Sequence, residues 1–584
     1  MHNIRRLFIA ASILIVAIEP FPAMACGGFF CTTQPINQAA EQIVFHQDGN
    51  QVTAMVRILY TGEAEDFSWV VPVPDTPEIS LGADATFNEL EFATRPQFNL
   101  LTEGNVCEQD MFVNLAQPAA EASAADAGDG GVQIEEELTI GPFDIDIVSS
   151  DNADDMSIWL EDNGYFLDDR GRDLIEPYVL DGMKFVAVKL RSGESSGSIQ
   201  PLIMQYPIEK PMIPIRLTAV AAQDDMGVLV WVVNDARAIP ENYEHVTPNY
   251  TKLDWYSGSF NAYLSYQNLI TEAMDEAGGQ GFATDYAGGI TADIRGALTD
   301  VDVIEGNLAL LDAIENDAEY LTSSLFINTN PSAALANISA VLPLPEGQDT
   351  NLYFDSAQLA AVFTPAELSD ARIAMRQAIV DRELTPIADS VALLPQDAYL
   401  TRLFTTLSAS DMTVDPTFNF NSNMPEQSIQ REALLNASCE NGTSQWSLTL
   451  GSGTGREGEK VLEVNDEPIP FLVLPTPIDD QPSAFLRQRT SANAEPELLF
   501  QAESSLLEIG AVDNGADGNG AVDNGVDGNG AVDNGAIGSV AASNDDGFLG
   551  AAGFGWLLIA TAGLWSRRWH SQAWHSVVQQ HRLK

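Results

Sequence analysis

The chain has 584 residues, of which 84 are acidic and 27 basic, so its formal net charge is −57. A field of this sign repels DNA, RNA and anionic lipid surfaces, which excludes a nucleic-acid-binding function. It leaves open whether the acidic surface attracts divalent cations or only keeps the protein soluble in salty surroundings.

The first 25 residues (1–25) predict a secretory signal peptide. Arg5 and Arg6 form its basic start, and the apolar stretch Leu7–Ile18 follows. This stretch is too short to span a bilayer, so it is typical of an export signal rather than an anchor. A small-residue cleavage site ends at Ala25, and cleavage there makes Cys26 the first residue of the mature chain.

The four cysteines are Cys26, Cys31, Cys107 and Cys439. "CGGFFC" is not the C-x-x-C of a redox pair, and a zinc site would need a second close pair. A lipid on Cys26 would leave an odd number of thiols outside the cell. An oxidising compartment favours disulfides, so we expect the bridges Cys26–Cys31 and Cys107–Cys439.

The mature chain begins with strand patterns. "EQIVFHQDGNQVTAMVRILYTG" (residues 41–62) has two alternating runs around Asp48–Asn50, which predicts a hairpin. In "FSWVVPVPDTPEI" (67–79), Pro72 and Pro74 restrict the segment to a sheet edge or an extended rim. Trp69 and the two prolines either line a recognition rim or, as the favoured interpretation, belong to a packed strand.

Two helices and four further strands are expected next. "DATFNELEFAT" (84–94) is amphipathic, and "DNADDMSIWLEDNGYFL" (151–167) reads as a helix that stops at Asn163-Gly164. The four strand candidates have the spacing of a meander: "KFVAVKL" (184–190), "IQPLIMQY" (199–206), "IPIRLTAV" (213–220) and "GVLVWVVND" (227–235).

Beyond about residue 258 the apolar period becomes helical. Phe260–Ala277 ends at a glycine, and a capping box joins Thr364 to Glu367 at the start of the next clear helix. "DAYLTRLFTTLSASDM" (397–412) is expected to be another helix, whereas "SQWSLTL" (444–450) and "KVLEV" (460–464) return to strands. Between them "GTGREG" (453–458) matches a dinucleotide-binding pattern, but opens no helix and is interpreted as a turn.

Together these elements predict an α+β protein, in which an N-terminal, antiparallel, sandwich-like β-rich part packs with a helical part. We expect one extracytoplasmic domain over residues 26–475, divisible into a β-rich 26–257 and a helix-rich 258–475. A linker is expected over 476–547, because the near-repeats of 511–535, such as "AVDNGADGNG", have too little apolar surface to fold.

The C-terminus predicts one transmembrane helix. Residues 548–565 form an uncharged run just long enough to span a bilayer, and Arg567 and Arg568 follow it. Positive charge stays inside, so 566–584 is the expected cytoplasmic tail and the domain lies outside. The run also looks somewhat like a bacterial sorting tag, whose helix is cut off; the longer tail favours permanent anchoring.

Two motifs resemble functional sites, a hydrolase nucleophile and a calcium loop, but neither is the favoured interpretation. "GESSG" (193–197) places Ser195 in the pattern of a hydrolase nucleophile, with Asp235 and His245 after it, but the pattern must join a strand to a helix and here leads to another strand. Asp513 and Asp517 partly resemble a calcium loop, but Gly515 replaces an oxygen ligand and the final glutamate is missing. No catalytic, cofactor-binding or metal-binding set is predicted.

Several stretches together resemble one bacterial family. "CGGFFC", "PINQAAEQIVF", "YTGEAEDFSWVVPVP", "WLEDNGY" and "LTRLFTTLSASDMTVDPTF" occur in an order similar to that of the domain of unknown function 2330, over about residues 26–420. The resemblance implies an exported envelope protein, often with a membrane anchor near its C-terminus. It brings no established catalytic residues.

The sequence therefore predicts a membrane-anchored extracytoplasmic protein of the bacterial cell envelope with a non-catalytic binding or structural role. Its expected partners are the membrane, through one C-terminal helix, and an envelope protein or ligand that the sequence does not identify. The alternatives are an exported hydrolase using Ser195 and His245, and calcium-dependent adhesion through the acidic surface. No cofactor is expected, and calcium is the one ion considered.

Overall fold

The computed structural model describes residues 38–60, 67–104, 133–165, 169–192, 194, 199–220, 222–256, 258–297, 301–326, 331–345, 347–440, 443–464, 481–503 and 507–509. The expected signal peptide, the near-repeats of 511–535, the transmembrane helix and the tail lie outside these residues, and so do Cys26, Cys31 and Cys107. The expectations for those segments stay predictions.

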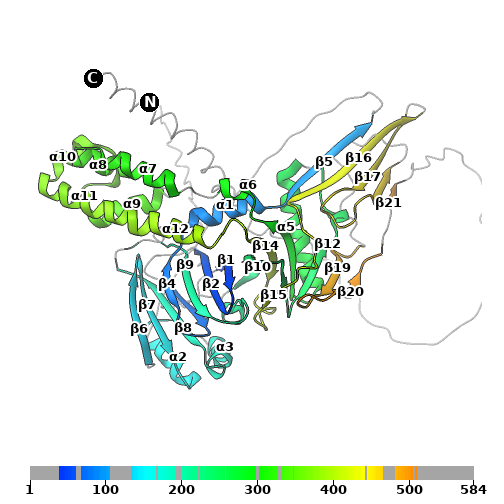
Figure 1. Ribbon diagram of the computed structural model, residues 1–584, viewed down its shortest axis with the longest axis horizontal. Coiled ribbons are helices and arrows are strands. Elements are labelled where there is room, and N and C mark those ends of the chain that lie inside the picture. The colour runs from blue at the N-terminus through cyan, green and yellow to red at the C-terminus, as the bar shows by residue number, and fades with distance from the viewer. Residues whose placement is uncertain are drawn as a thin grey trace, which may run out of the picture.

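A sheet of ten strands forms the centre of the molecule (Figure 1). Its pairs are antiparallel except β1 with β10 and β12 with β13, so the expected antiparallel sheet is a mixed one. In spatial order its strands are β20 (Glu497–Gln501), β19 (Ala484–Arg489), β12 (Glu244–Pro248), β13 (Gly281–Gly289), β14 (Tyr399–Leu407), β10 (Ala222–Asn234), β1 (Gln38–Asp48), β2 (Gln51–Tyr60), β9 (Leu202–Pro207) and β4 (Glu78–Leu81).

A smaller sheet packs on one face of the ten strands, so this part is a sandwich. Its order is β3 (Ser68–Val73), β8 (Lys184–Leu190), β7 (Phe143–Ser149) and β6 (Gln133–Ile140). Side chains such as Phe45 and Val230 share one core with Trp69 and Val188 of the smaller sheet. Helices α2 (Ala153–Asp162) and α3 (Asp169–Leu180) cover its outer face. The expected edge position of β3 is confirmed.

The opposite face of the ten strands is covered by helices and by a third sheet. Helices α1 (Asp84–Thr94) and α6 (Ala292–Ala297) lie over β1, β10 and β14, and α5 (Gly258–Glu276) packs between β12–β13 and the third sheet. The third sheet has the order β21 (Leu507–Ile509), β18 (Lys460–Val464), β17 (Thr443–Leu450), β16 (Gln430–Glu440) and β5 (Gln97–Gly104). A two-stranded ribbon pairs β11 (Ala238–Pro240) with β15 (Phe418–Phe420).

A helical part with its own core projects from the sheets, at the left of Figure 1. It consists of α7 (Val301–Asp312), α8 (Asp317–Ser324), α9 (Pro331–Val341), η4 (Thr350–Phe354), α10 (Ser356–Val362), α11 (Pro365–Ile379), the π-helical turn η5 (Val380–Leu384) and α12 (Thr385–Ala392). The capping box predicted for Thr364 and Glu367 is present at the start of α11. Helix α12 packs against α1 and β4, which joins this part to the sheets.

Three expectations about individual segments are wrong. Residues 213–220 were expected to be a strand, but they contain the short helix α4 (Ile215–Thr218). The expected meander does not form, because β8 lies in the smaller sheet and β1 and β2 stand between β9 and β10. Residues 397–412 were expected to be a helix, yet they supply β14 in the middle of the large sheet.

Part of the segment expected to be a linker is folded. Residues 484–501 fall in the segment assigned to it, and they form β19 and β20 instead, adding two strands to the large sheet. Ser483 and Ala484 donate their backbone N–H groups to the carboxylate of Glu276 at 2.7 and 2.9 Å, so this segment is tied to the end of α5. Within the described parts of the chain, no helix is long and apolar enough to cross a bilayer.

The interpretation of "GTGREG" as a turn is confirmed. The motif links β17 to β18, and Gly453, Gly455 and Gly458 all have positive φ angles. Gly453 is special among them, because a Cβ there would lie 2.0 Å from the carbonyl oxygen of Gln430, whereas one at Gly458 would meet nothing within 4 Å.

We therefore expect Gly453→Ala to cost more stability than Gly458→Ala. Both substitutions force alanine into the left-handed region, which costs about 1–2 kcal/mol, and Gly453→Ala adds a clash with the backbone of β16. Chemical denaturation of the two variants measures the difference. Equal losses would contradict the close approach of the turn to β16.

Candidate functional site

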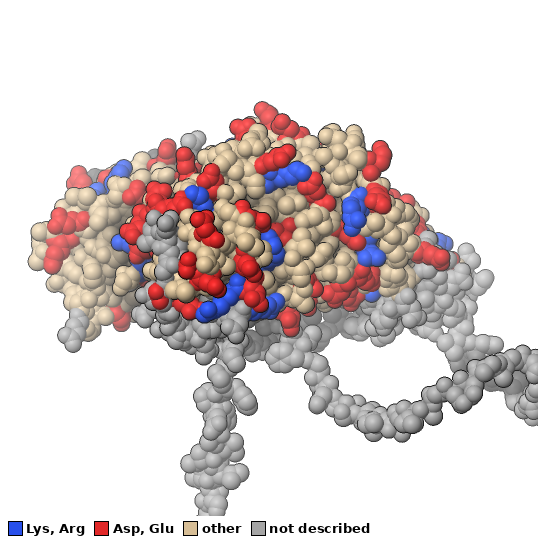
Figure 2. Space-filling model, turned by 90° about the horizontal axis from the view of Figure 1, so that it is seen from below, with Lys and Arg blue, Asp and Glu red and all other residues tan. Residues whose placement is uncertain are grey.

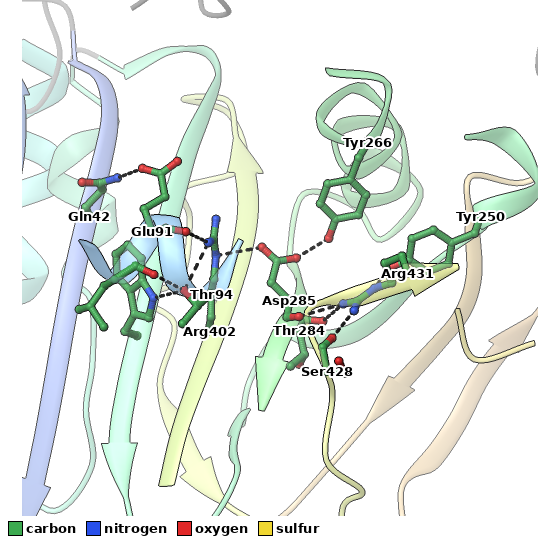
Figure 3. Close-up of polar contacts among 12 residues, drawn as sticks. Gln42, Glu91, Thr94, Tyr250, Tyr266, Thr284, Asp285, Arg402, Ser428 and Arg431 are labelled. Atoms are coloured by element: carbon green, nitrogen blue, oxygen red, sulfur yellow. Dashed lines mark hydrogen bonds and ion pairs between the residues drawn. The ribbon is translucent and has the colours of Figure 1, made fainter. Parts of the chain in front are cut away.

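The described part of the chain contains two features that can bear on function. One is a chain of buried polar side chains beneath α1 and α5 (Figure 3), and the other is a hollow beside β3. We take the polar chain first.

Arg402 is the centre of the buried polar chain. It lies on β14 and is 1% exposed. Its Nε lies 3.1 Å from Oδ2 of Asp285 on the neighbouring strand β13, in an ion pair buried on both sides. Its Nη1 donates to the carbonyl oxygen of Glu91 at 3.2 Å, at the end of α1. A guanidinium in the middle of a sheet is stable only with such partners.

Asp285 connects Arg402 to the third sheet (Figure 3). The hydroxyl of Tyr266, on α5, donates to its Oδ1. Arg431, on β16, donates from Nη2 to the carbonyl oxygen of Asp285 at 2.9 Å and from Nε to the hydroxyl of Tyr250 at 3.0 Å. The rings of Tyr250 and Tyr266 stack at 6.2 Å. One carboxylate and two arginines thus join the large sheet, α5 and β16.

On its other side Arg402 approaches Trp231 and α1. Its guanidinium lies 5.6 Å from the centre of the Trp231 ring. The indole Nε1 donates to Oγ1 of Thr94 at 2.9 Å, and Oγ1 in turn donates to the carbonyl oxygen of Leu90 at 2.6 Å. The last turn of α1 is therefore fixed over β10 and β14.

A second arginine fixes the start of α1. Arg57, on β2, lies 3.0 Å from Asp84 through its Nε and donates from Nη1 to Oδ1 of Asn88 at 2.7 Å. Gln42 of β1 accepts from Arg57 at 3.3 Å and donates to Glu91 at 3.4 Å. Burial raises the pKa of both Asp84 and Glu91, and the neighbouring arginines oppose that rise.

The buried polar chain acts as a structural connector. Its charged groups contact one another and the backbone, and its members come from the large sheet and from α1, α5 and the third sheet, which cover one face of it. The sequence analysis did not find it, because its members are far apart in the chain. The available signal was a charged residue inside an apolar strand, such as Arg402 in "YLTRLFTTL" or Asp285 in "FATDYAG".

The predicted hydrolase residue His245 lies in the interior. It is 7% exposed on β12, and its Nε2 is 3.1 Å from Oγ1 of Thr284 and 3.4 Å from Nη2 of Arg237. Burial, and then the charge of Arg237, lower the pKa of His245 to about 3. The ring is therefore neutral near pH 7, and its Nε2 accepts from the guanidinium.

Ser195 lies outside the described residues, and its pairing with His245 stays a prediction. Described residues close to it on either side are Glu194 and Gln200, and both bind Arg382 of η5, at 2.7 Å each. Gln200 lies two residues before β9, which five strands separate from β12. At the usual strand spacing that is about 29 Å. The described residues flanking Ser195 are thus far from His245.

The burial of His245 predicts a pH dependence. In the unfolded chain its pKa is near 6.5 and in the fold about 3, so between these values only the unfolded chain binds the proton. The contribution of neutral His245 to the free energy of unfolding is therefore complete above pH 6.5. Below that pH it is lost, by about 1.4 kcal/mol for each pH unit.

We expect His245→Gln to flatten the fall in the free energy of unfolding from pH 7 to pH 4. Denaturant titrations across this range measure the slopes. His46→Gln is the matched control, because His46 is only half-buried on β1. Burial lowers the pKa of His46, but the charge of Asp48 opposes that shift, so its effect on the slope should be smaller. Identical slopes for wild type and His245→Gln would show that the ring is not buried neutral.

The second feature is a hollow between β3 and the large sheet. Trp69, Pro72 and Pro74, the residues considered as a recognition rim, line it from the β3 side. Phe45 and Tyr206 are among those that face them from the large sheet. Met204, Met212 and Glu41 also lie on its wall, and the free space within it is about 30 Å³. Trp69 is itself only 7% exposed, as expected for a packed strand.

The expected disulfides and the calcium alternative stay predictions. Of the four cysteines, Cys439 alone lies in a described strand, β16, and the others lie outside the described residues. In the described ranges no three histidine, cysteine, aspartate or glutamate side chains gather in a way that could hold a metal ion. Asp513 and Asp517 lie outside those ranges.

Comparison with known proteins gives one match. The family model of uncharacterized proteins conserved in bacteria, DUF2330, matches residues 20–323, which is more than half of the chain. No curated protein and no solved structure matches. The matched range includes His245, Asp285 and the β3 wall of the hollow. The resemblance noted in the sequence is thus confirmed, and the chain belongs to the DUF2330 family of uncharacterised bacterial proteins.

Proposed function

We propose that this protein is exported and tethered in the bacterial cell envelope by one C-terminal membrane helix, and that its α+β body has a binding or structural role without catalysis. The address rests on the sequence of residues 1–25 and 548–584. The proposed non-catalytic role rests on the burial of the charged and histidine side chains of the α+β domain, such as Arg402, Asp285 and His245.

One observation carries the non-catalytic role: the charged side chains at the centre of the buried polar chain are paired with each other inside the fold. Arg402 and Asp285 are each 1% exposed and paired, and His245 is 7% exposed beneath Arg237. A substrate would have to separate α1 or α5 from the sheet to reach them. These buried side chains join the large sheet to the helices that cover it. We therefore expect the domain to act through its surface.

The surface is in keeping with an extracytoplasmic protein that does not bind nucleic acid. On the face in Figure 2, aspartate and glutamate side chains are spread over most of the visible body, and the few lysines and arginines lie beside them. Elsewhere among the described residues, basic side chains form ion pairs with acidic ones, including Lys184 with Glu135 and Arg382 with Glu194. The remaining negative charge favours solubility and repels anionic polymers.

Membrane tethering makes a direct prediction. The full-length protein is expected in the membrane fraction, and protease added to spheroplasts should release a large soluble fragment. Removing residues 548–584 should send the body into the soluble extracytoplasmic fraction. Removing the near-repeats of 511–535 is the matched control, since it shortens the chain without touching the helix. Soluble protein that was expressed from the full-length sequence but lacks residues 548–584 would show a cleaved tag instead of a tether.

The non-catalytic role is tested with a fluorophosphonate probe, which labels activated serines. We expect no labelling that depends on Ser195. Labelling that disappears in both Ser195→Ala and His245→Gln would overturn the proposal and establish the hydrolase. The two tests are independent, because fractionation tests where the protein is located and the fluorophosphonate probe tests whether it is catalytic.

A further inference from the structure

We propose that α7 to α11 of the helical part form an arm that swings on the sheets at the π-helical turn η5, and that Arg382 and Glu194 are the latch that holds the arm in the position of Figure 1. Three features support such a motion: separate cores, a break in the helical hydrogen bonding and the contacts of Arg382. The motion goes beyond the proposed function, which assigns no moving part to the domain.

The arm and the sheets have separate cores. The buried and half-buried side chains that the structure describes in the core of the arm all fall within residues 308–384. Beyond η5, Ile387 of α12 packs against Ala83, just before α1, and the backbone N–H of Ala83 donates to Oγ of Ser390 at 2.9 Å. Leu384, in η5 itself, is half-buried against both clusters. The chain therefore passes from one core to the other within η5.

The helical hydrogen bonding is broken at the same place. Helix α11, η5 and α12 follow one another without a loop from Pro365 to Ala392. At the end of η5 the N–H of Thr385 donates to the carbonyl oxygen of Val380, five residues back, as in a π-helix. The next residue, Pro386, has no N–H to donate to the carbonyl oxygen of Arg382, four residues back. Prolines and π-turns are the usual sites at which a helix bends.

Two side chains from the sheets hold this turn. Gln200, two residues before β9, donates from Nε2 to the carbonyl oxygen of Arg382 at 2.7 Å, in place of the missing N–H. Glu194, in the segment after β8, accepts both terminal nitrogens of Arg382 at 2.7 and 3.3 Å. The same guanidinium donates to Oδ1 of Asn337, on α9 of the arm, at 3.0 Å. Arg382 thus joins the arm to both sheets at one point.

The neck of the arm is narrow. The chain enters the arm at α7 and leaves it through η5, and these two elements are in contact. Helix α6, which precedes α7, stays with the sheets, because Arg295 donates to the carbonyl oxygen of Leu394 after α12. The arm can therefore turn about this neck while its own core stays packed. The latch is shielded from water, since the side chains of Arg382 and Glu194 are only 17% and 9% exposed.

Single-molecule FRET on the full-length protein in detergent tests the motion. The two dyes are attached through p-acetylphenylalanine in place of Ile373 on α11 and Leu180 at the end of α3, which are 67% and 76% exposed. The wild type should give one narrow population. Arg382→Met should broaden it about twofold or add a second population, because the latch is lost. A single unchanged population in Arg382→Met would overturn the proposal.

Arg376→Met is the matched control. Arg376 lies on α11, but its ion pair with Asp312 stays within the arm, so the population should remain that of the wild type. Hydrogen exchange checks the core: peptides that carry Leu368 and Met375 should be as protected in Arg382→Met as in the wild type. Loss of that protection would mean that the arm unfolds rather than swings, and would also overturn the proposal.

Pro386→Ala tests the position of the hinge. It returns the missing N–H to the helix, which should then bend less. Added to Arg382→Met, it should narrow the population back toward that of the wild type. Failure to narrow it would place the motion outside η5 and overturn the hinge. None of these outcomes depends on whether the C-terminal helix is kept, so failure here is distinct from failure of the proposed tether.

Discussion

Arg402→Met is expected to destabilise the fold by about 3–5 kcal/mol. The substitution keeps an apolar stem beside Trp231 but leaves the carboxylate of Asp285 buried without its ion-pair partner. Burial already raises the pKa of Asp285, and the loss of Arg402 raises it further. A raised carboxyl pKa favours the fold at low pH, so the loss of stability should be larger at pH 8 than at pH 5. Denaturant unfolding at both values measures it.

Two further variants show whether the effect belongs to the buried pair. Arg402→Met with Asp285→Asn removes the uncompensated charge and should recover part of the loss. Arg376→Met breaks the exposed pair of Arg376 with Asp312 on the helical part and should cost about 0–1 kcal/mol. If Arg402→Met is as mild as Arg376→Met, the polar chain does not hold the layers together.

The second large effect is expected from the disulfide Cys107–Cys439. β5 runs parallel to β16, and Gly104 is the register partner of Ala437. Cys439 stands two residues beyond Ala437, and Cys107 three residues beyond Gly104, within about 11 Å of it along the chain. Neighbouring strands are about 4.8 Å apart, a distance that a disulfide can bridge. The described register places the end of β5 beside the strand that carries Cys439, and the pairing of Cys107 with Cys439 stays a prediction.

Loss of this bridge should cost up to about 5 kcal/mol, because it closes a very long loop. Cys107→Ser, Cys439→Ser and the double variant should then lose the same stability, since either single change already removes the bridge. Cys26→Ser with Cys31→Ser is the comparison, at about 2 kcal/mol for a tight loop. Peptide mapping that finds Cys107 and Cys439 as free thiols would refute the pairing.

Local patterns predicted the elements whose signals are local. The hairpin of β1 and β2 turns at Gly49, where φ is positive, and helix α1 occupies the predicted residues 84–94. Helix α2 stops at its C-cap Asn163, as predicted, and Asn152 is its N-cap. These elements are specified by alternation, by caps or by turn residues within one short stretch.

The failure at β14 has a physical cause. In "YLTRLFTTL", Leu400, Leu403 and Leu407 have the spacing of a helix face. In the fold Leu403 and Leu407 enter the sandwich core, while Leu400 packs on the opposite side of the sheet. A strand that is buried on both faces has no reason to alternate, so its period cannot be distinguished from that of a helix.

The polar chain and the hollow were beyond local reasoning for a different reason. Arg402 finds its partners on α1 and β13, and the hollow is formed by strands of two sheets. The sequence did single out Trp69, Pro72 and Pro74, yet it could not tell which surface would face them. The order of the strands in the sheets determines which of these distant residues come into contact. A short sequence pattern does not contain that order.

The position of β14 also determines when the central sheet can close as the chain is made. It lies between β10 and β13, although about a hundred residues of helical part separate it from β13 in the sequence. The family match ends at residue 323, so the matched region alone would leave both neighbours of β14 with one open edge each, and open edges invite aggregation. A chain that emerges N-terminus first therefore cannot close its central sheet until residue 407 has emerged. Until then, one edge of β10 and one edge of β13 are without their strand partner.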